Sequence, residues 1–138
     1  MRSCPLIQMV QAYATDAAHA ARDTLQINLD FSFESLRDFD EVLNRYLPHY
    51  TDAAQLVALG DAPELEGRFP FPAQMWGSYI GEVLRRKWGG EWVQLAPDAY
   101  PELLVKGRQV SPSAAVAQWF ESSGAASVSK FVEDIAAA

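Results

Sequence analysis

The sequence contains few of the residues that bind metal ions or act as nucleophiles. It has one cysteine, Cys4, and two histidines, with no Cys/His spacing of the zinc type. A single cysteine cannot form an internal disulfide, so we expect a reducing compartment, and the cytoplasm is the simplest choice. A Gly-x-Ser-x-Gly elbow, a Walker-type phosphate loop and a GxGxxG turn are also missing. The sequence therefore predicts no metal site and no cofactor, and it identifies no catalytic residue.

Long apolar runs and an excess of positive charge are lacking as well. No stretch approaches the ~18 consecutive apolar residues that a membrane span needs. The formal net charge of -7 opposes binding to a phosphate backbone, which requires a basic surface. We therefore expect neither membrane nor nucleic-acid binding. The same charge would speed the encounter with a basic protein partner.

The residue pattern predicts a single α+β domain over residues 1–138, of which 49% are hydrophobic and 21% charged. It is mainly helical, with a small antiparallel sheet of two or three strands, about 91–110, packed on a central helix, about 72–88. Further helices are expected over 3–26, 32–47, 51–60, from 112 to 120 and from about 126. In the second of these, Ser32 is the expected N-cap.

The central stretch, residues 69–92, carries three of the four tryptophans and four of the eight glycines. At 100° per residue, its helix has an apolar face made by Trp76, Tyr79, Ile80, Val83, Leu84 and Trp88. Packing roles are expected for Trp76, Gly77, Gly81, Trp88 and Trp92. Two glycines inside a helix cost ~1 kcal/mol each relative to alanine, so Gly77 and Gly81 indicate that another backbone approaches closely.

The opposite face of this helix is the candidate binding surface. It carries Gln74, Ser78, Glu82, Arg85 and Arg86, and the last turn adds arginine, a residue type enriched at interface hot spots. Two interpretations of Glu82 are open. Nearby Trp and Tyr side chains would raise its pKa and make it an acid or base. Arginines three and four positions later would instead keep it ionised in a structural ion pair.

The first helix offers one further cluster of ionisable residues. Asp16, His19 and Asp23 lie on one face at spacings of three and four, which is compatible with metal ligation. Two carboxylates beside an exposed histidine ordinarily stabilise its protonated form. We therefore predict no metal here.

A resemblance adds to this picture. With LDFSFESLRDFDEVL before it and a strand pair after it, the segment WGSYIGEVLRRKWGGEW resembles a group of small bacterial proteins with a GxYxGEVxRRxxGGEW-type helix motif, a domain of unknown function. The resemblance covers about residues 27–135. It depends on Gly77, Tyr79, Gly81, Glu82, Arg85, Gly89, Gly90 and Trp92. It implies an α+β fold and no established activity.

Three functions stay open at this point. The missing catalytic motifs favour a non-enzymatic module that binds another protein, such as an immunity or inhibitor protein for a toxin or effector. An alternative is a small-ligand enzyme or sensor that uses Glu82 and Arg85 in a pocket. The third is a structural protein that self-associates through the Gly77/Gly81 face, so both monomer and homodimer are compatible with the sequence.

Overall fold

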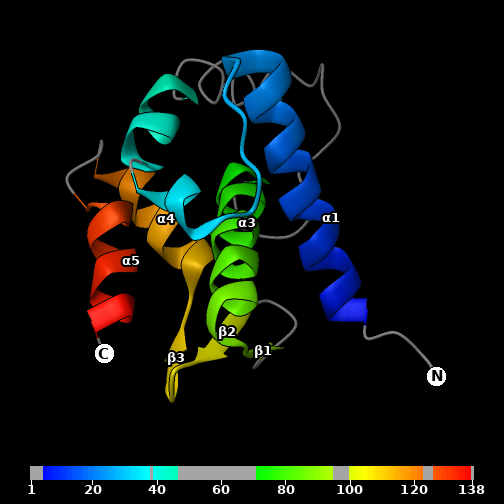
Figure 1. Cartoon of the computed structure of the whole chain (residues 1–138), viewed down its shortest axis with the longest axis vertical. Coiled ribbons are helices and arrows are strands. Elements are labelled where there is room, and N and C mark those ends of the chain that lie inside the picture. Colours follow the sequence, from blue (N-terminus) through cyan, green and yellow to red (C-terminus); the bar gives the residue numbers. More distant parts are fainter. Residues whose placement is uncertain (1–4, 38, 47–70, 95–99, 123–125, 138) are drawn as a thin grey trace.

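Helices make up most of the chain in the computed structural model, which describes residues 5–37, 39–46, 71–94, 100–122 and 126–137 (Figure 1). A three-stranded antiparallel sheet completes the fold. The α+β architecture predicted from the sequence is confirmed. The expected helix over 51–60, the loop after it and Cys4 lie outside the described residues.

Helix α1 (Pro5–Ala20) continues into one π-helical turn, η1 (Ala21–Leu25). Its buried face is built from small residues with larger ones near its ends, namely Val10, Ala14, Ala17, Ala21 and Leu25. Small side chains let two helix backbones approach closely, and α1 makes its main contact with α3. The alanine-rich composition therefore serves close packing and not only helix propensity.

The segment after α1 differs from its prediction. In place of one helix from Ser32, the chain forms a 3₁₀-helix, η2 (Phe33–Leu36), and a separate helical segment over 39–46. Ser32 is the N-cap residue of η2, as predicted, but its side chain makes no capping hydrogen bond. The cause is tertiary. The Tyr79 hydroxyl accepts the backbone N–H of Phe31 at 3.0 Å and shares a 2.7 Å hydrogen bond with Ser35 Oγ.

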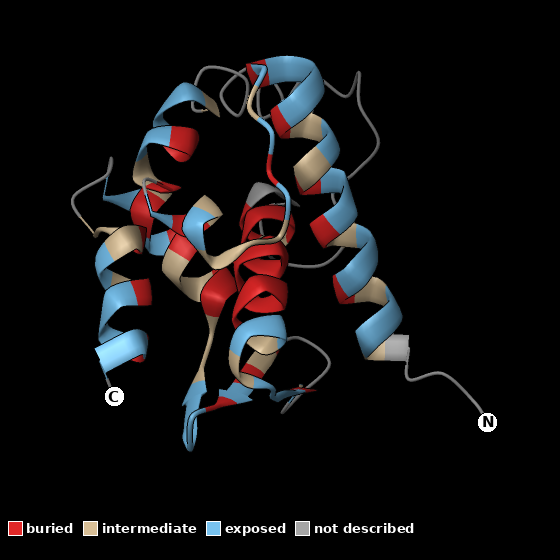
Figure 2. Cartoon of the chain, viewed as in Figure 1, coloured by how far each residue is buried: buried red, intermediate tan, exposed pale blue. Residues whose placement is uncertain are grey.

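The central helix α3 (Phe71–Trp88) is the core of the molecule. It lies between α1 and the C-terminal helices (Figure 1). Every residue from Met75 to Leu84 is buried, so the helix is enclosed on all sides along this length (Figure 2). Three basic residues occupy the last turn, where positive charge favours the helix dipole. Gly89 then ends it with φ +77°.

The sheet follows directly, in the order β1-β2-β3. Its strands are β1 (Glu91–Val93), β2 (Glu102–Val105) and β3 (Arg108–Val110). Strands β2 and β3 form a hairpin whose two turn residues, Lys106 and Gly107, have φ values of 53° and 74°. Positive φ at both positions is the pattern of a type I′ turn. The small antiparallel sheet predicted over about 91–110 is therefore confirmed.

Helix α4 (Pro112–Glu121) begins as predicted, because Ser111 Oγ accepts the Ala114 N–H at 3.3 Å and proline occupies the first position. It packs against α3 and presents Val116 and Trp119 to the core. None of the described helices is both long enough and apolar enough to cross a bilayer.

Helix α5 (Val128–Ala137) is held at both ends by residues from elsewhere. At its start, the Asp40 carboxylate accepts the Val128 N–H at 2.8 Å and the Ser127 hydroxyl at 2.6 Å. At its end, Lys106 Nζ donates to the Ala136 carbonyl at 2.9 Å, and Arg108 donates to that of Asp134 at 3.2 Å. Negative charge at the N-terminus and positive charge at the C-terminus both stabilise the helix dipole.

Candidate functional site

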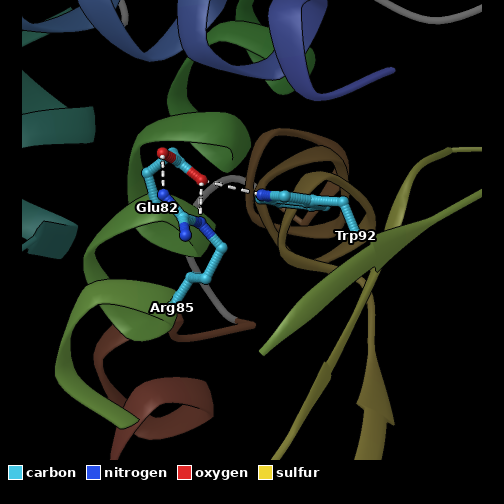
Figure 3. Close-up of polar contacts among 3 residues, drawn as sticks. All are labelled: Glu82, Arg85 and Trp92. Atoms are coloured by element: carbon cyan, nitrogen blue, oxygen red, sulfur yellow. Dashed lines mark hydrogen bonds and ion pairs between the residues drawn. The ribbon is translucent and has the colours of Figure 1, made fainter. Parts of the chain in front are cut away.

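Glu82 is the most deeply buried carboxylate in the described part of the chain, with 0% of its surface exposed. Its two oxygens accept a bidentate pair of bonds from Arg85, at 2.8 Å from Nε and 3.0 Å from Nη2 (Figure 3). The indole N–H of Trp92 donates a third bond at 2.8 Å. The carboxylate thus joins helix α3 to strand β1, and its hydrogen-bonding capacity is largely used within the protein.

Opposing influences set the protonation of this group. Burial raises the pKa of the Glu82 carboxyl, whereas the bonds from Arg85 and Trp92 and the charges of Arg85 and Arg86 lower it. The net effect is a pKa below the usual value. The same pairing raises the pKa of Arg85. Of the two interpretations of Glu82, the structural ion pair is confirmed, and the raised pKa expected of an acid or base is not found.

Both glycines of α3 lie against other parts of the chain. A Cβ on Gly77 would lie 2.4 Å from the Cα of Ser113, at the start of α4. A Cβ on Gly81 would lie 2.2 Å from the indole ring of Trp92. The close backbone approach predicted for the pair occurs at Gly77, and at Gly81 an indole takes that place. This face is therefore covered by the same chain and not by a second copy.

The polar face expected from the helical wheel is largely buried. Ser78 is 3% exposed and Glu82 is fully enclosed, so the wheel's assignment of these two residues to the surface was wrong. Gln74 and Arg85 are half-buried, and Arg86 is exposed. The wheel failed because it sorts residues by polarity. Here the buried carboxylate is neutralised by Arg85 on the same helix and accepts a further hydrogen bond from the indole of Trp92.

The tryptophans divide between core and surface. Trp76 is fully buried and makes T-shaped contacts with Phe39 and Tyr46, and its indole nitrogen has no hydrogen-bond partner among the described residues. Trp92 is 5% exposed and fills the space beside Gly81. Trp88, by contrast, is only half-buried. It lies at the C-terminal end of α3, near exposed cationic side chains and other half-buried aromatic rings.

That end of α3 carries a set of half-buried aromatic rings, each covered by a cation. Arg86 lies over the Phe31 ring at 4.1 Å, Lys87 over Phe33 at 5.3 Å and Lys106 over Trp88 at 4.7 Å. The rings of Phe33 and Trp88 are themselves in T-shaped contact at 5.2 Å. We call Phe31, Phe33, Arg86, Lys87, Trp88 and Lys106 the cation–aromatic cluster.

Sequence reasoning found only part of this cluster. Arg86 was on the predicted binding face and Trp88 was assigned to packing, but Phe31, Phe33, Lys87 and Lys106 were not selected. Their segments are separated by tens of residues, and only the folded chain brings η2, α3 and the β2–β3 hairpin together. One signal was present in the sequence: two phenylalanines flank Ser32 immediately before a helical pattern.

The described residues give little support for a metal or cofactor site. No three His, Cys, Asp or Glu side chains among the described residues are grouped so that they could hold a metal ion. On η1, Asp23 pairs with Arg22 at 3.0 Å, and both are exposed. Two hollows lie beside η2, and both are lined by residues other than Glu82 and Arg85.

Because no known protein matches the chain, any functional conclusion depends on the residues described above. The resemblance of residues 27–135 to the bacterial group with the helix motif stays a prediction. Comparison of the chain with protein-family models, with curated proteins and with solved structures gives no match.

Proposed function

We propose that this protein is a non-enzymatic module that binds another protein through the cation–aromatic cluster. The observation that carries the proposal is the grouping of half-buried aromatic rings with exposed cations at one end of α3. Aromatic and arginine side chains are enriched where protein interfaces derive most of their binding energy. Phenylalanine and tryptophan rings bury a large apolar area when a partner covers them, and long cationic side chains can cover apolar surface with their stems while their charged ends stay in water.

Two features of Glu82 make catalysis the weaker alternative. Its carboxylate is enclosed and accepts three hydrogen bonds from Arg85 and Trp92, so a substrate would have to displace them. Its lowered pKa also disfavours proton donation near neutral pH. Self-association through Gly77 and Gly81 is disfavoured as well, because Ser113 and Trp92 occupy that face.

An immunity or inhibitor role for a toxin or effector is the specific form of the proposal. Small size and a single domain suit a protein that covers a partner's surface. The net charge of -7 favours a basic partner at long range, whereas the cluster favours carboxylates at close range. A partner that presents an acidic segment within a basic surface satisfies both the long-range and the close-range preference.

Affinity capture from the source cell tests this function. The intact protein serves as bait, beside the variant Arg86→Glu, which reverses an exposed charge of the cluster. Lys130→Glu is the matched control, because Lys130 is also exposed but lies on α5 outside the cluster. We expect a partner with the wild-type protein and with Lys130→Glu, and loss of that partner with Arg86→Glu. Equal capture by all three baits, or capture of nothing above background, would refute the proposal.

A further inference from the structure

A groove lined by residues of η2 and α5 lies next to the cation–aromatic cluster. Its cavity has a volume of about 190 Å³. The apolar lining comes from Phe33 and Leu36 on one side and from Val132 and Ala136 on the other. Phe33 belongs to both the groove and the cluster. The groove therefore extends the cluster by an apolar cavity.

The two ends of the groove are formed by different contacts. At one end, Ser129 Oγ donates to the Arg37 carbonyl at 3.4 Å. At the other end, Lys106 contacts the Ala136 carbonyl, and Lys87 lies over the Phe33 ring. This second end therefore carries two exposed ammonium groups beside an apolar cavity.

Charged residues also line the groove. Glu34 and Glu133 contribute carboxylates and Arg37 a guanidinium. The two carboxylates would repel an anion placed beside them, whereas the ammonium groups of Lys87 and Lys106 favour one at their end, and the other end offers the single positive charge of Arg37. A polyanion such as a nucleic acid, with phosphates along its whole length, fits this arrangement poorly.

We propose that the groove binds an acidic segment of the partner protein. An apolar side chain of that segment enters the cavity, and carboxylates next to it contact Lys87 and Lys106. This inference rests on the protein-binding function proposed above. A volume of about 190 Å³ lies below the ~300–1,000 Å³ of sites that enclose a whole cofactor or drug-sized ligand. It suits one apolar side chain, and the adjacent ammonium groups supply the charge complementarity.

Synthetic peptides test the occupant directly. The first is a short acidic peptide with one phenylalanine, the second has serine in its place, and the third is a basic peptide that keeps the phenylalanine. Each is titrated into the ¹⁵N-labelled full chain, and amide shifts are followed by NMR. We expect the first peptide to shift residues of η2 and α5. Loss of phenylalanine burial should weaken binding roughly tenfold or more, and the basic peptide should not bind.

Two pairs of variants assign the binding to the groove. Ala136→Leu fills the cavity, whereas Ala137→Leu adds the same side chain one residue later, outside the lining. Ala136→Leu should abolish the shifts and Ala137→Leu should leave them. Lys87→Glu should weaken binding of the acidic peptide roughly three- to tenfold, and the control Lys130→Glu should not. Circular dichroism of each variant confirms that the fold is retained.

Each outcome separates this inference from the function it rests on. Equal binding of the phenylalanine and serine peptides, shifts outside η2 and α5, or tighter binding of a single-stranded oligonucleotide would overturn the acidic-segment proposal. If the peptides fail but Arg86→Glu still abolishes partner capture, the protein-binding function stands and only the groove occupant is wrong. If Arg86→Glu leaves capture unchanged while the peptides bind as expected, the function proposed for the whole cluster is wrong, and the groove proposal stands on Phe33, Lys87 and Lys106 alone.

Discussion

Removing Arg85 from the Glu82–Arg85 pair should lower the free energy of unfolding more than removing Glu82 does. Arg85→Met leaves a carboxylate with 0% exposure and only the Trp92 bond, and breaking a buried pair in this way costs ~3–5 kcal/mol. Glu82→Gln leaves a guanidinium whose side chain is 32% exposed. Water can hydrate it, so the cost should be only ~1–3 kcal/mol, that of lost charge-assisted hydrogen bonds.

Urea unfolding followed by circular dichroism measures both costs at neutral pH. The double variant Glu82→Gln/Arg85→Met supplies the control. Once the carboxylate is gone, removing Arg85 exposes no buried charge, so the double variant should be less destabilised than the sum of the single changes. Strictly additive costs, or a larger cost for Glu82→Gln than for Arg85→Met, would refute the asymmetry.

The pH dependence of the free energy of unfolding gives a second test of the pair, because the direction of the change can be predicted. Because the pKa of Glu82 is lowered in the folded protein, its contribution to stability is complete above the unfolded pKa and is lost as the pH falls through the folded one. Glu82→Gln should therefore lose less stability in acid than the wild type. In Arg85→Met, burial dominates and the pKa rises, so its deficit should shrink as the pH falls. A deficit that grows in acid would contradict this reasoning.

Close packing and shared hydrogen bonds make three further substitutions informative. Gly77→Ala should lower the free energy of unfolding by ~2–3 kcal/mol in urea titrations, because its Cβ would meet the Ser113 backbone; an unchanged midpoint would contradict it. Tyr79→Phe should cost ~1–2 kcal/mol and speed amide exchange at Phe31, which loses its acceptor; full protection there would argue otherwise. Asp40→Asn should cost ~1 kcal/mol and raise exchange mainly in the first turn of α5; a uniform rise would count against local capping.

Much of the fold could be predicted because its signals are local. Ser111 followed by Pro112 places the start of α4, and the period of Val128, Val132 and Ile135 defines α5. The hairpin at Lys106 required only a glycine in the turn and strand-like residues on both sides. The glycines of α3 could also be interpreted, since glycine in a helix is costly unless something packs against it.

The errors have a common physical origin in contacts between distant segments. Ser32 occupies an N-cap position without making the capping bond, and the Tyr79 hydroxyl holds the Phe31 N–H and the Ser35 side chain on either side of it. Glu82 has the polarity of a surface residue, yet Arg85 and Trp92 make its burial tolerable. In both cases a hydrogen bond with another element, with Tyr79 for the first and with Trp92 for the second, contributes to the observed arrangement and is not evident from the local sequence.

The capping of α5 by Asp40, Lys106 and Arg108 links its folding to its role in the groove. A helix of 10 residues is marginal on its own in water, where isolated helices need ~12–15 residues. Its order therefore depends on groups that other elements supply after they have assembled, so α5 should form late and open first. Because α5 is one wall of the groove, a segment bound there would also stabilise the helix. Binding of the segment and folding of α5 would then be coupled, so that each stabilises the other.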